Sequence, residues 1–111
     1  MIKIRTLKFI VNGQIIEKDP KCDFSNLIPG TEQYLKLEFS FSSEWNGYDK
    51  VVQFKRFRKE FSPQVLVDGK SCLIPADAAN QKMFNIKVLG RKGKTKLNTN
   101  SVLVVQDGGN K

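Results

Sequence analysis

Residues 34–54 read YLKLEFSFSSEWNGYDKVVQF, and this stretch decides the fold of the chain. In its first half apolar residues alternate with polar ones, which predicts a β-strand with one face in a core and the other in solvent; the apolar positions are Leu35, Leu37, Phe39 and Phe41. Asn46-Gly47 favours a tight reversal, because both residue types tolerate a positive φ. A second apolar run, residues 51–54, predicts a strand that pairs with the first, with the single tryptophan, Trp45, at the corner between them.

Similar short segments extend outward from this stretch. Residues 2–11 and 14–17 predict a hairpin that turns at Asn12-Gly13, and residues 64–67 and 71–74 predict another that turns at Asp68-Gly69. Further alternating or apolar runs predict strands at residues 84–88, 95–97 and 101–105. Residues 75–80 are long enough for about one helical turn.

Two segments carry more specific expectations. Residues 18–33 contain Asp19-Pro20 and Pro29-Gly30 and lack either periodicity, so we expect a long connection that crosses from one sheet to another. Three of its apolar residues should lie against the core: Phe24, Leu27 and Ile28. Residues 102–105, VLVV, are apolar on both faces, which predicts a strand that is either central in its sheet or covered by a partner.

Short strands separated by turns, without amphipathic helices, indicate an all-β fold. We expect an immunoglobulin-like antiparallel β-sandwich of about eight short strands with at most one short helical turn. Residues 1–106 should form this single domain, since a chain of 111 residues can bury an independent core. Residues 107–111 should form a flexible C-terminal tail.

The bulk composition limits the surroundings of the protein. Its net charge of +8 and its pI near 9.7 favour anionic partners: nucleic acid, acidic lipid or an acidic protein surface. The two cysteines, Cys22 and Cys72, are expected to be free thiols in a reducing compartment. No secretory signal and no run of eighteen apolar residues is visible, so we expect synthesis in a cytoplasm and no membrane partner.

The sequence holds few groups for chemistry. It has no histidine, which removes the commonest general base and most zinc and copper sites, and its glycines form no phosphate-binding loop. We therefore predict no catalytic, cofactor-binding or metal-binding residues, and no enzyme. Glu44 and Asp49 beside Trp45 could resemble the paired acids of a glycosidase, but their spacing is more typical of solvated residues at a hairpin corner.

Aromatic and basic residues offer two alternatives to a purely structural interpretation. Trp45, with Tyr48, could form a platform for a sugar or a base, although a lone tryptophan in a small sandwich more often anchors the core, which is our prediction here. Two basic clusters could follow a phosphate backbone or could be solvated loops. The candidate contact residues are Lys55, Arg56, Arg58, Lys59, Arg91, Lys92, Lys94 and Lys96, with Phe57 and Phe61 interleaved in the first cluster.

Residues 37–47, LEFSFSSEWNG, resemble an alternating strand and Glu-Trp-(Asp or Asn)-Gly corner found in small β-sandwich structural proteins of tailed bacteriophages. The resemblance continues through residues 65–69, 73–75, 85–90 and 99–100, and covers about residues 34–105. The group includes modules like the N-terminal module of upper baseplate proteins, and head or tail accessory proteins. The basic residues 55–59 depart from the pattern, in which a short neutral turn is common.

This resemblance implies a non-enzymatic virion protein, located in a capsid decoration, tail or baseplate. Its partners would be other virion proteins, acidic surfaces or further copies of itself. Two other functions stay open: a basic protein that binds nucleic acid or inhibits a host defence, and a carbohydrate-binding module for host attachment.

Overall fold

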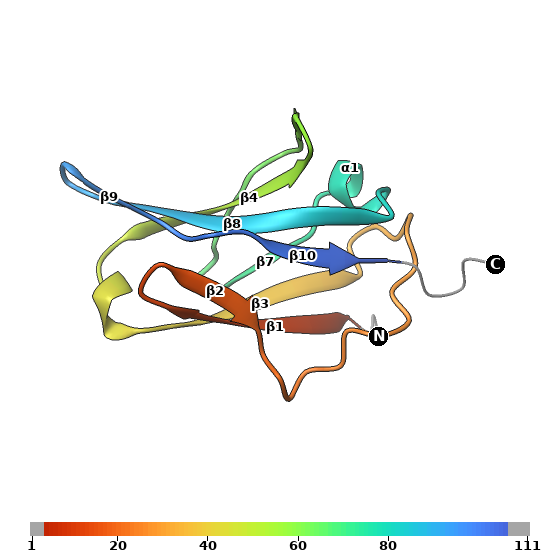
Figure 1. The fold of residues 1–111 in the computed structure, drawn as a ribbon, viewed down its shortest axis with the longest axis horizontal. Helices are drawn as coiled ribbons and strands as arrows, with labels where there is room; N and C mark the ends of the chain where they lie inside the picture. Colours follow the sequence, from red (N-terminus) through yellow and green to blue (C-terminus); the bar gives the residue numbers. More distant parts are fainter. Residues whose placement is uncertain (1–3, 107–111) are drawn as a thin grey trace.

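Two β-sheets pack face to face in the computed structural model, which describes residues 4–106 (Figure 1). The four-stranded sheet has the order β2-β1-β3-β7 and comprises Arg5–Asn12 (β1), Ile15–Lys18 (β2), Leu35–Phe41 (β3) and Ser71–Leu73 (β7). The six-stranded sheet has the order β10-β8-β4-β5, with β6 also on β4 and β9 also on β8. Its strands are Asp49–Arg56 (β4), Lys59–Glu60 (β5), Gln64–Val65 (β6), Met83–Lys92 (β8), Thr95–Asn98 (β9) and Val102–Val105 (β10). The predicted all-β sandwich is confirmed.

The core lies between the sheets and follows from the alternation of apolar residues. β3 buries Leu35, Leu37 and Phe39, while its intervening residues face outward. β8 does the same with Phe84, Ile86 and Val88. The helical content of the described residues is one 3-10 turn, Ser43–Trp45 (η1), and one short helix, Ala76–Ala79 (α1), which begins immediately after Pro75.

The connection at residues 18–33 returns to the sheet that it leaves, so the predicted crossing between sheets is wrong. β3 lies beside β1 in parallel, with Leu7 opposite Leu37, on the side of β1 away from β2. Two parallel neighbours cannot be joined by a tight turn, and this explains the length of the connection. The predicted antiparallel pairing is therefore wrong for β1 with β3, whereas the other strand pairs described are antiparallel.

Arg5 holds this connection against the sheet. Its guanidinium donates hydrogen bonds to the carbonyl oxygens of Asp23, Ser25 and Asn26 at 2.7–3.3 Å. Leu27 is buried, and the Phe24 ring packs edge-on against Phe9 with centroids 5.3 Å apart, as predicted. Ile28 is 54% exposed, so its predicted place in the core is wrong; the preceding Leu27 occupies the inward position instead.

The corner around Trp45 joins the two sheets rather than two paired strands. β3 belongs to the four-stranded sheet and β4 to the six-stranded one, so the pairing predicted between them is wrong. The chain turns through η1 and Gly47, whose φ is +81°. Alternation defined the buried face of each strand, but it carries no information on which strand lies alongside.

Both predicted turns are present, the first with a difference in register. The strand pairing predicted for the second hairpin, residues 64–67 with 71–74, is wrong, because it is limited to one antiparallel bridge between Val67 and Ser71. Asn12 pairs with Ile15, so the two central residues are Gly13 and Gln14, and Gly13 takes the positive φ of +59°. In the other turn Asp68 and Gly69 both have positive φ, as an Asp-Gly turn requires. This second turn also links the sheets, because β6 pairs with β4 and β7 pairs with β3.

β10 is an edge strand, so of the two places predicted for residues 102–105 the central one is wrong, and cover by a partner stays a prediction. It pairs with β8 on one side and ends the order of the six-stranded sheet. Val104 is buried, whereas Leu103 is 40% exposed. The predicted flexible tail at residues 107–111 and the beginning of the predicted first strand lie outside the described residues.

Candidate functional site

Trp45 lies inside the sandwich, at the end where the chain crosses between sheets. Its side chain has no exposed surface, and its indole N–H donates a 2.7 Å hydrogen bond to the carbonyl oxygen of Gly13. The ring packs against Phe41 and Tyr48, with centroids 5.3 and 6.0 Å away. A buried indole offers no face to a sugar or a base, so the geometry agrees with a core anchor.

The other residues of this corner are arranged for structure. Tyr48 is half-buried, and the Lys92 ammonium lies 5.9 Å from the centre of its ring. Glu44 is exposed and accepts a 3.2 Å hydrogen bond from the Ser42 hydroxyl. Asp49 is exposed at the start of β4. These carboxylates fit the interpretation as solvated turn residues.

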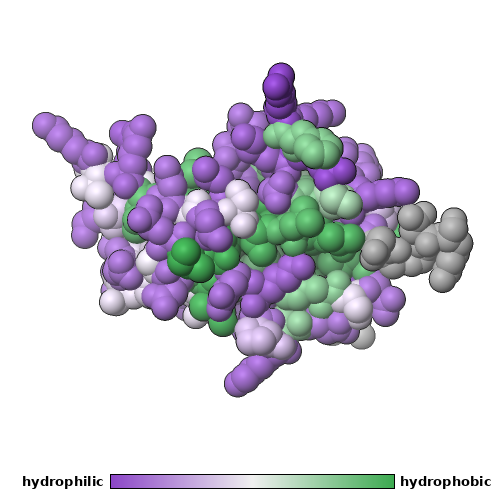
Figure 2. All heavy atoms as spheres, viewed as in Figure 1, coloured by the Kyte–Doolittle hydropathy of each residue, from purple (hydrophilic) through white to green (hydrophobic). Residues whose placement is uncertain are grey.

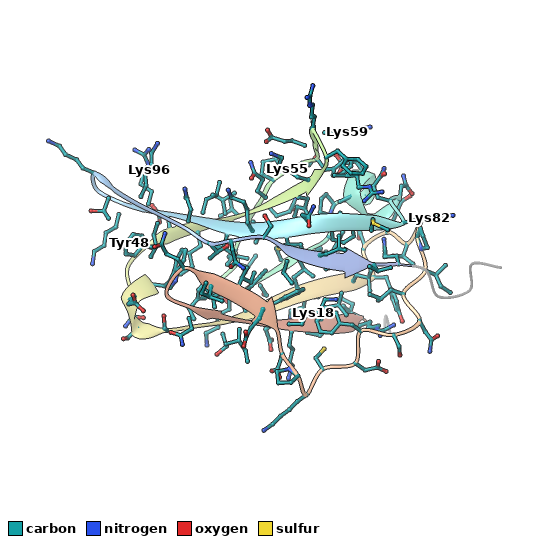
Figure 3. All side chains as sticks on the ribbon, viewed as in Figure 1. Lys18, Tyr48, Lys55, Lys59, Lys82 and Lys96 are labelled. Carbon is teal, nitrogen blue, oxygen red and sulfur yellow. The ribbon has the colours of Figure 1, made fainter. Side chains whose placement is uncertain are left out.

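The first basic cluster forms the tip of the β4–β5 hairpin, which we call the Phe57 tip; it comprises Lys55, Arg56, Phe57, Arg58 and Lys59. Arg56 pairs with Lys59, which leaves Phe57 and Arg58 as the two turn residues. Phe57 is 79% exposed and has a φ of +56°. The guanidinium carbon of Arg56 lies 4.2 Å from the centre of the Phe57 ring. In Figure 3 the labelled Lys59 marks this tip, which projects beyond the body of the sandwich.

The second basic cluster lies on the β8–β9 hairpin. Arg91 pairs directly with Lys96, and Lys92 pairs with Thr95 across the turn. The four cations of this cluster, Arg91, Lys92, Lys94 and Lys96, are all exposed. Gly93 supplies the positive φ of the turn, +59°.

The two clusters occupy opposite ends of the six-stranded sheet, so the eight predicted contact residues do not form a single patch. β4 and β8 are antiparallel, with Lys55 opposite Asn85 and Asp49 opposite Arg91. These two positions are six steps apart along β8, which is roughly 20 Å at about 3.4 Å per residue. Lys87, which sequence reasoning missed, lies between them on the same face as Asn85 and Arg91.

Both cysteines are free thiols in the structure, as predicted. Cys22 is partly exposed, and its sulfur accepts a hydrogen bond from the Lys8 backbone N–H at 3.3 Å. Cys72 is buried in the core, and burial raises the pKa of its thiol from 9.0 to about 12. At pH 8 this thiol therefore carries almost no reactive thiolate.

This difference predicts two classes of thiol. In native protein at pH 8, Ellman's reagent should titrate the Cys22 thiol first, while the Cys72 thiol should react only as the protein opens or is denatured. Absorbance at 412 nm measures both phases, and a Cys72→Ala variant should lack the slow one. Equal, fast reaction of both thiols in native protein would contradict the burial of Cys72.

The remaining surface of residues 4–106 contains one large concavity. This concavity, of about 620 Å³, lies beside the C-terminal half of β3. It is lined by charges of both signs, among them Lys8, Glu38, Lys50 and Asp68. No group of three or more His, Cys, Asp or Glu side chains is gathered to hold a metal within residues 4–106. In the same part of the chain, no helix is long and apolar enough to cross a membrane.

Known proteins add nothing to this geometry. Comparison with protein-family models, curated proteins and solved structures found no match. The functional interpretation therefore depends on two surfaces that the structure presents: the Phe57 tip with the cations along its sheet, and the open edge of β10.

Proposed function

We propose that this chain is a non-enzymatic structural protein of a tailed-phage virion that acts through protein–protein contacts, as a capsid decoration or as part of a tail or baseplate. Two observations support the proposal. One is the resemblance of residues 37–47 to the strand and corner of such proteins. The other, which carries the mechanism, is the open apolar edge of β10.

The backbone of β10 can accept another strand. The Gln106 N–H donates to the Lys82 carbonyl oxygen at 2.6 Å, and bonded and non-bonded pairs alternate along an antiparallel ladder. Val104, opposite Phe84, is therefore a bonded position. The N–H and C=O groups of Leu103 and Val105 consequently point away from β8. β2 approaches this side at Asn100, which bonds to Gln14 and Ile16, but it forms no ladder with β10 in the described residues. Strand addition to such an edge supplies main-chain hydrogen bonds to a partner.

The residues of β10 lack the features that usually prevent an edge strand from pairing with another chain. Edge strands are commonly protected by lysines, prolines or bulges, whereas β10 consists of four apolar residues. Figure 2 shows apolar surface over β10 and the adjoining part of β2. Leu103 and Ile15 are 40% and 54% exposed there. On a repetitive particle many such contacts would act together, so each one can be weak.

Purified particles test this function. The chain should copurify with phage particles through a density gradient, at a fixed number of copies relative to the major capsid or tail protein, measured by quantitative mass spectrometry. Its absence from particles that assemble in cells producing it would overturn the proposal.

Substituting Leu103 tests the β10 edge within this function. Leu103→Lys places a charge on the contact surface without disturbing the core, and should lower the number of copies per particle about tenfold or more, since about 1.4 kcal/mol corresponds to a factor of ten. Leu73→Lys is the matched control, because Leu73 is 37% exposed on the other sheet. An equal number of copies per particle for the two variants would show that β10 does not form the contact.

A further inference from the structure

Phe57 is held in a conformation that the fold alone does not explain. A positive φ is rare for a bulky residue and costs free energy, and its ring is 79% exposed. Glycine or asparagine would form this turn more easily. A residue that is both strained and exposed contributes little to folding, and such residues concentrate at binding sites. The ring is therefore available for a contact outside the chain.

The ring is prepared for stacking on one side. Arg56 lies over one face, with its guanidinium carbon 4.2 Å from the ring centre. The large exposed fraction leaves the other face accessible to a flat ligand. An aromatic ring backed by arginine and surrounded by cations is the arrangement on which single-stranded nucleic acids stack their bases.

Charge around the ring favours phosphate. Lys55, Arg58 and Lys59 join Arg56 within the same hairpin. Two acidic residues lie on the strands of this hairpin: Glu60, opposite Lys55, and Asp49, at the far end of β4 opposite Arg91. Glu60 accepts a 3.0 Å hydrogen bond from the Gln53 side-chain amide. The tip holds four cations against this one carboxylate, so it carries an excess of positive charge.

The outer face of the six-stranded sheet continues this charge away from the tip. Lys55, Lys87 and Arg91 lie on that face along β4 and β8, and Lys96 adjoins Arg91. Figure 3 shows Lys55, Lys59 and Lys96 on the side of this sheet that faces away from β1 and β3. Successive residues on one face of a strand are about 7 Å apart. Cations spaced over roughly 20 Å suit an extended polyanion better than a compact acidic site on a protein.

We propose that this face, from the Phe57 tip to the β8–β9 hairpin, binds single-stranded nucleic acid. One base stacks on the free face of Phe57, and the phosphates follow Lys55, Lys87, Arg91 and Lys96. Binding of this kind depends on backbone charge and stacking, so it is tolerant of sequence and sensitive to salt. It is additional to the protein contacts of β10 and does not depend on them.

Fluorescence anisotropy with a labelled 20-nucleotide oligo(dT) tests the proposal at 50 to 300 mM NaCl. Wild-type protein should bind, with an affinity that falls steeply as salt rises. Phe57→Gly should weaken binding about 10- to 100-fold through loss of stacking. The same variant should keep or raise the melting temperature, because glycine accepts the positive φ without strain. Loss of binding together with loss of folding would contradict the assignment.

Two further arms identify the ligand class. An Arg91→Gln/Lys96→Gln variant should bind more weakly with a shallower salt dependence, whereas Lys8→Gln/Lys18→Gln, the same charge change on the four-stranded sheet, should bind like wild type. Poly-glutamate and vesicles containing phosphatidylserine serve as competing probes. No binding to oligo(dT) at 50 mM NaCl, equal binding by Phe57→Gly, or tighter Phe57-dependent binding to either probe would overturn the proposal.

Discussion

Replacing Trp45 with alanine should lower the free energy of unfolding by about 3 to 5 kcal/mol, the usual cost of deleting a large buried aromatic ring. The indole has no exposed surface and closes the end of the sandwich where β3 passes into β4. The substitution leaves a cavity and also removes the donor that pairs with the Gly13 carbonyl oxygen. Because Trp45 is the only tryptophan, unfolding of the variant should be followed by far-ultraviolet circular dichroism in urea rather than by fluorescence.

Trp45→Phe separates the two contributions to this effect. Phenylalanine keeps an aromatic ring between Phe41 and Tyr48 but cannot donate to Gly13, so its loss of stability should be smaller than that of Trp45→Ala. A decrease below about 1 kcal/mol for the alanine variant would show that the indole does not anchor the core, since exposed substitutions typically change stability by no more than about 0.5 kcal/mol.

Gly90→Ala should destabilise the fold by about 1 to 3 kcal/mol, the range found when a core is overpacked. A methyl group at Gly90 would lie 2.6 Å from Cζ3 of Trp45 and 3.2 Å from Cδ2 of Tyr48. Gly90 lies within β8, outside the positive-φ region, where alanine would otherwise stabilise by restricting the unfolded chain. The expected decrease in the free energy of unfolding therefore measures the steric contact with the indole, and urea denaturation gives the size of that decrease.

A double-mutant cycle assigns this decrease to Trp45. Gly90→Ala should cost less in a Trp45→Phe background, because the smaller ring vacates space near the new methyl group. Gly93→Ala is the control: Gly93 has a φ of +59° and no atom within 4 Å of its Cβ position, so its cost is one of backbone strain and should add independently. Additivity of Gly90→Ala with Trp45→Phe would contradict the steric explanation.

Local patterns predicted much of the fold, since they depend on residues close together in the chain. The alternation in residues 35–41 correctly predicted the buried face of β3, and Asp68-Gly69 correctly predicted a turn, in which both residues have positive φ. Which strands lie side by side depends on distant residues. The parallel pairing of β1 with β3 therefore left no signal in residues 18–33 beyond their length.

The candidate site was predicted in composition but not in arrangement. Counting basic residues found both clusters, but their separation follows from the register that sets Lys55 opposite Asn85. Period-2 alternation along β8 could have placed Lys87 on the outer face between them. The positive φ of Phe57 had no local signal, because an aromatic residue seldom occupies that position of a turn.

The order of strands in the two sheets has a consequence for biosynthesis. β4 lies against β8, with Val52 opposite Val88, and the parallel partner of β1 comes only after the long connection. Pairing between such distant segments is slow, because the intervening chain must first be brought together. While the ribosome is still adding the last quarter of the polypeptide, β4 lacks its ladder neighbour β8, and the apolar faces of β3 and β4 lack the part of the core that Phe84, Ile86 and Val88 fill. A holding chaperone that binds such faces would therefore act on the nascent chain, before the sandwich can close.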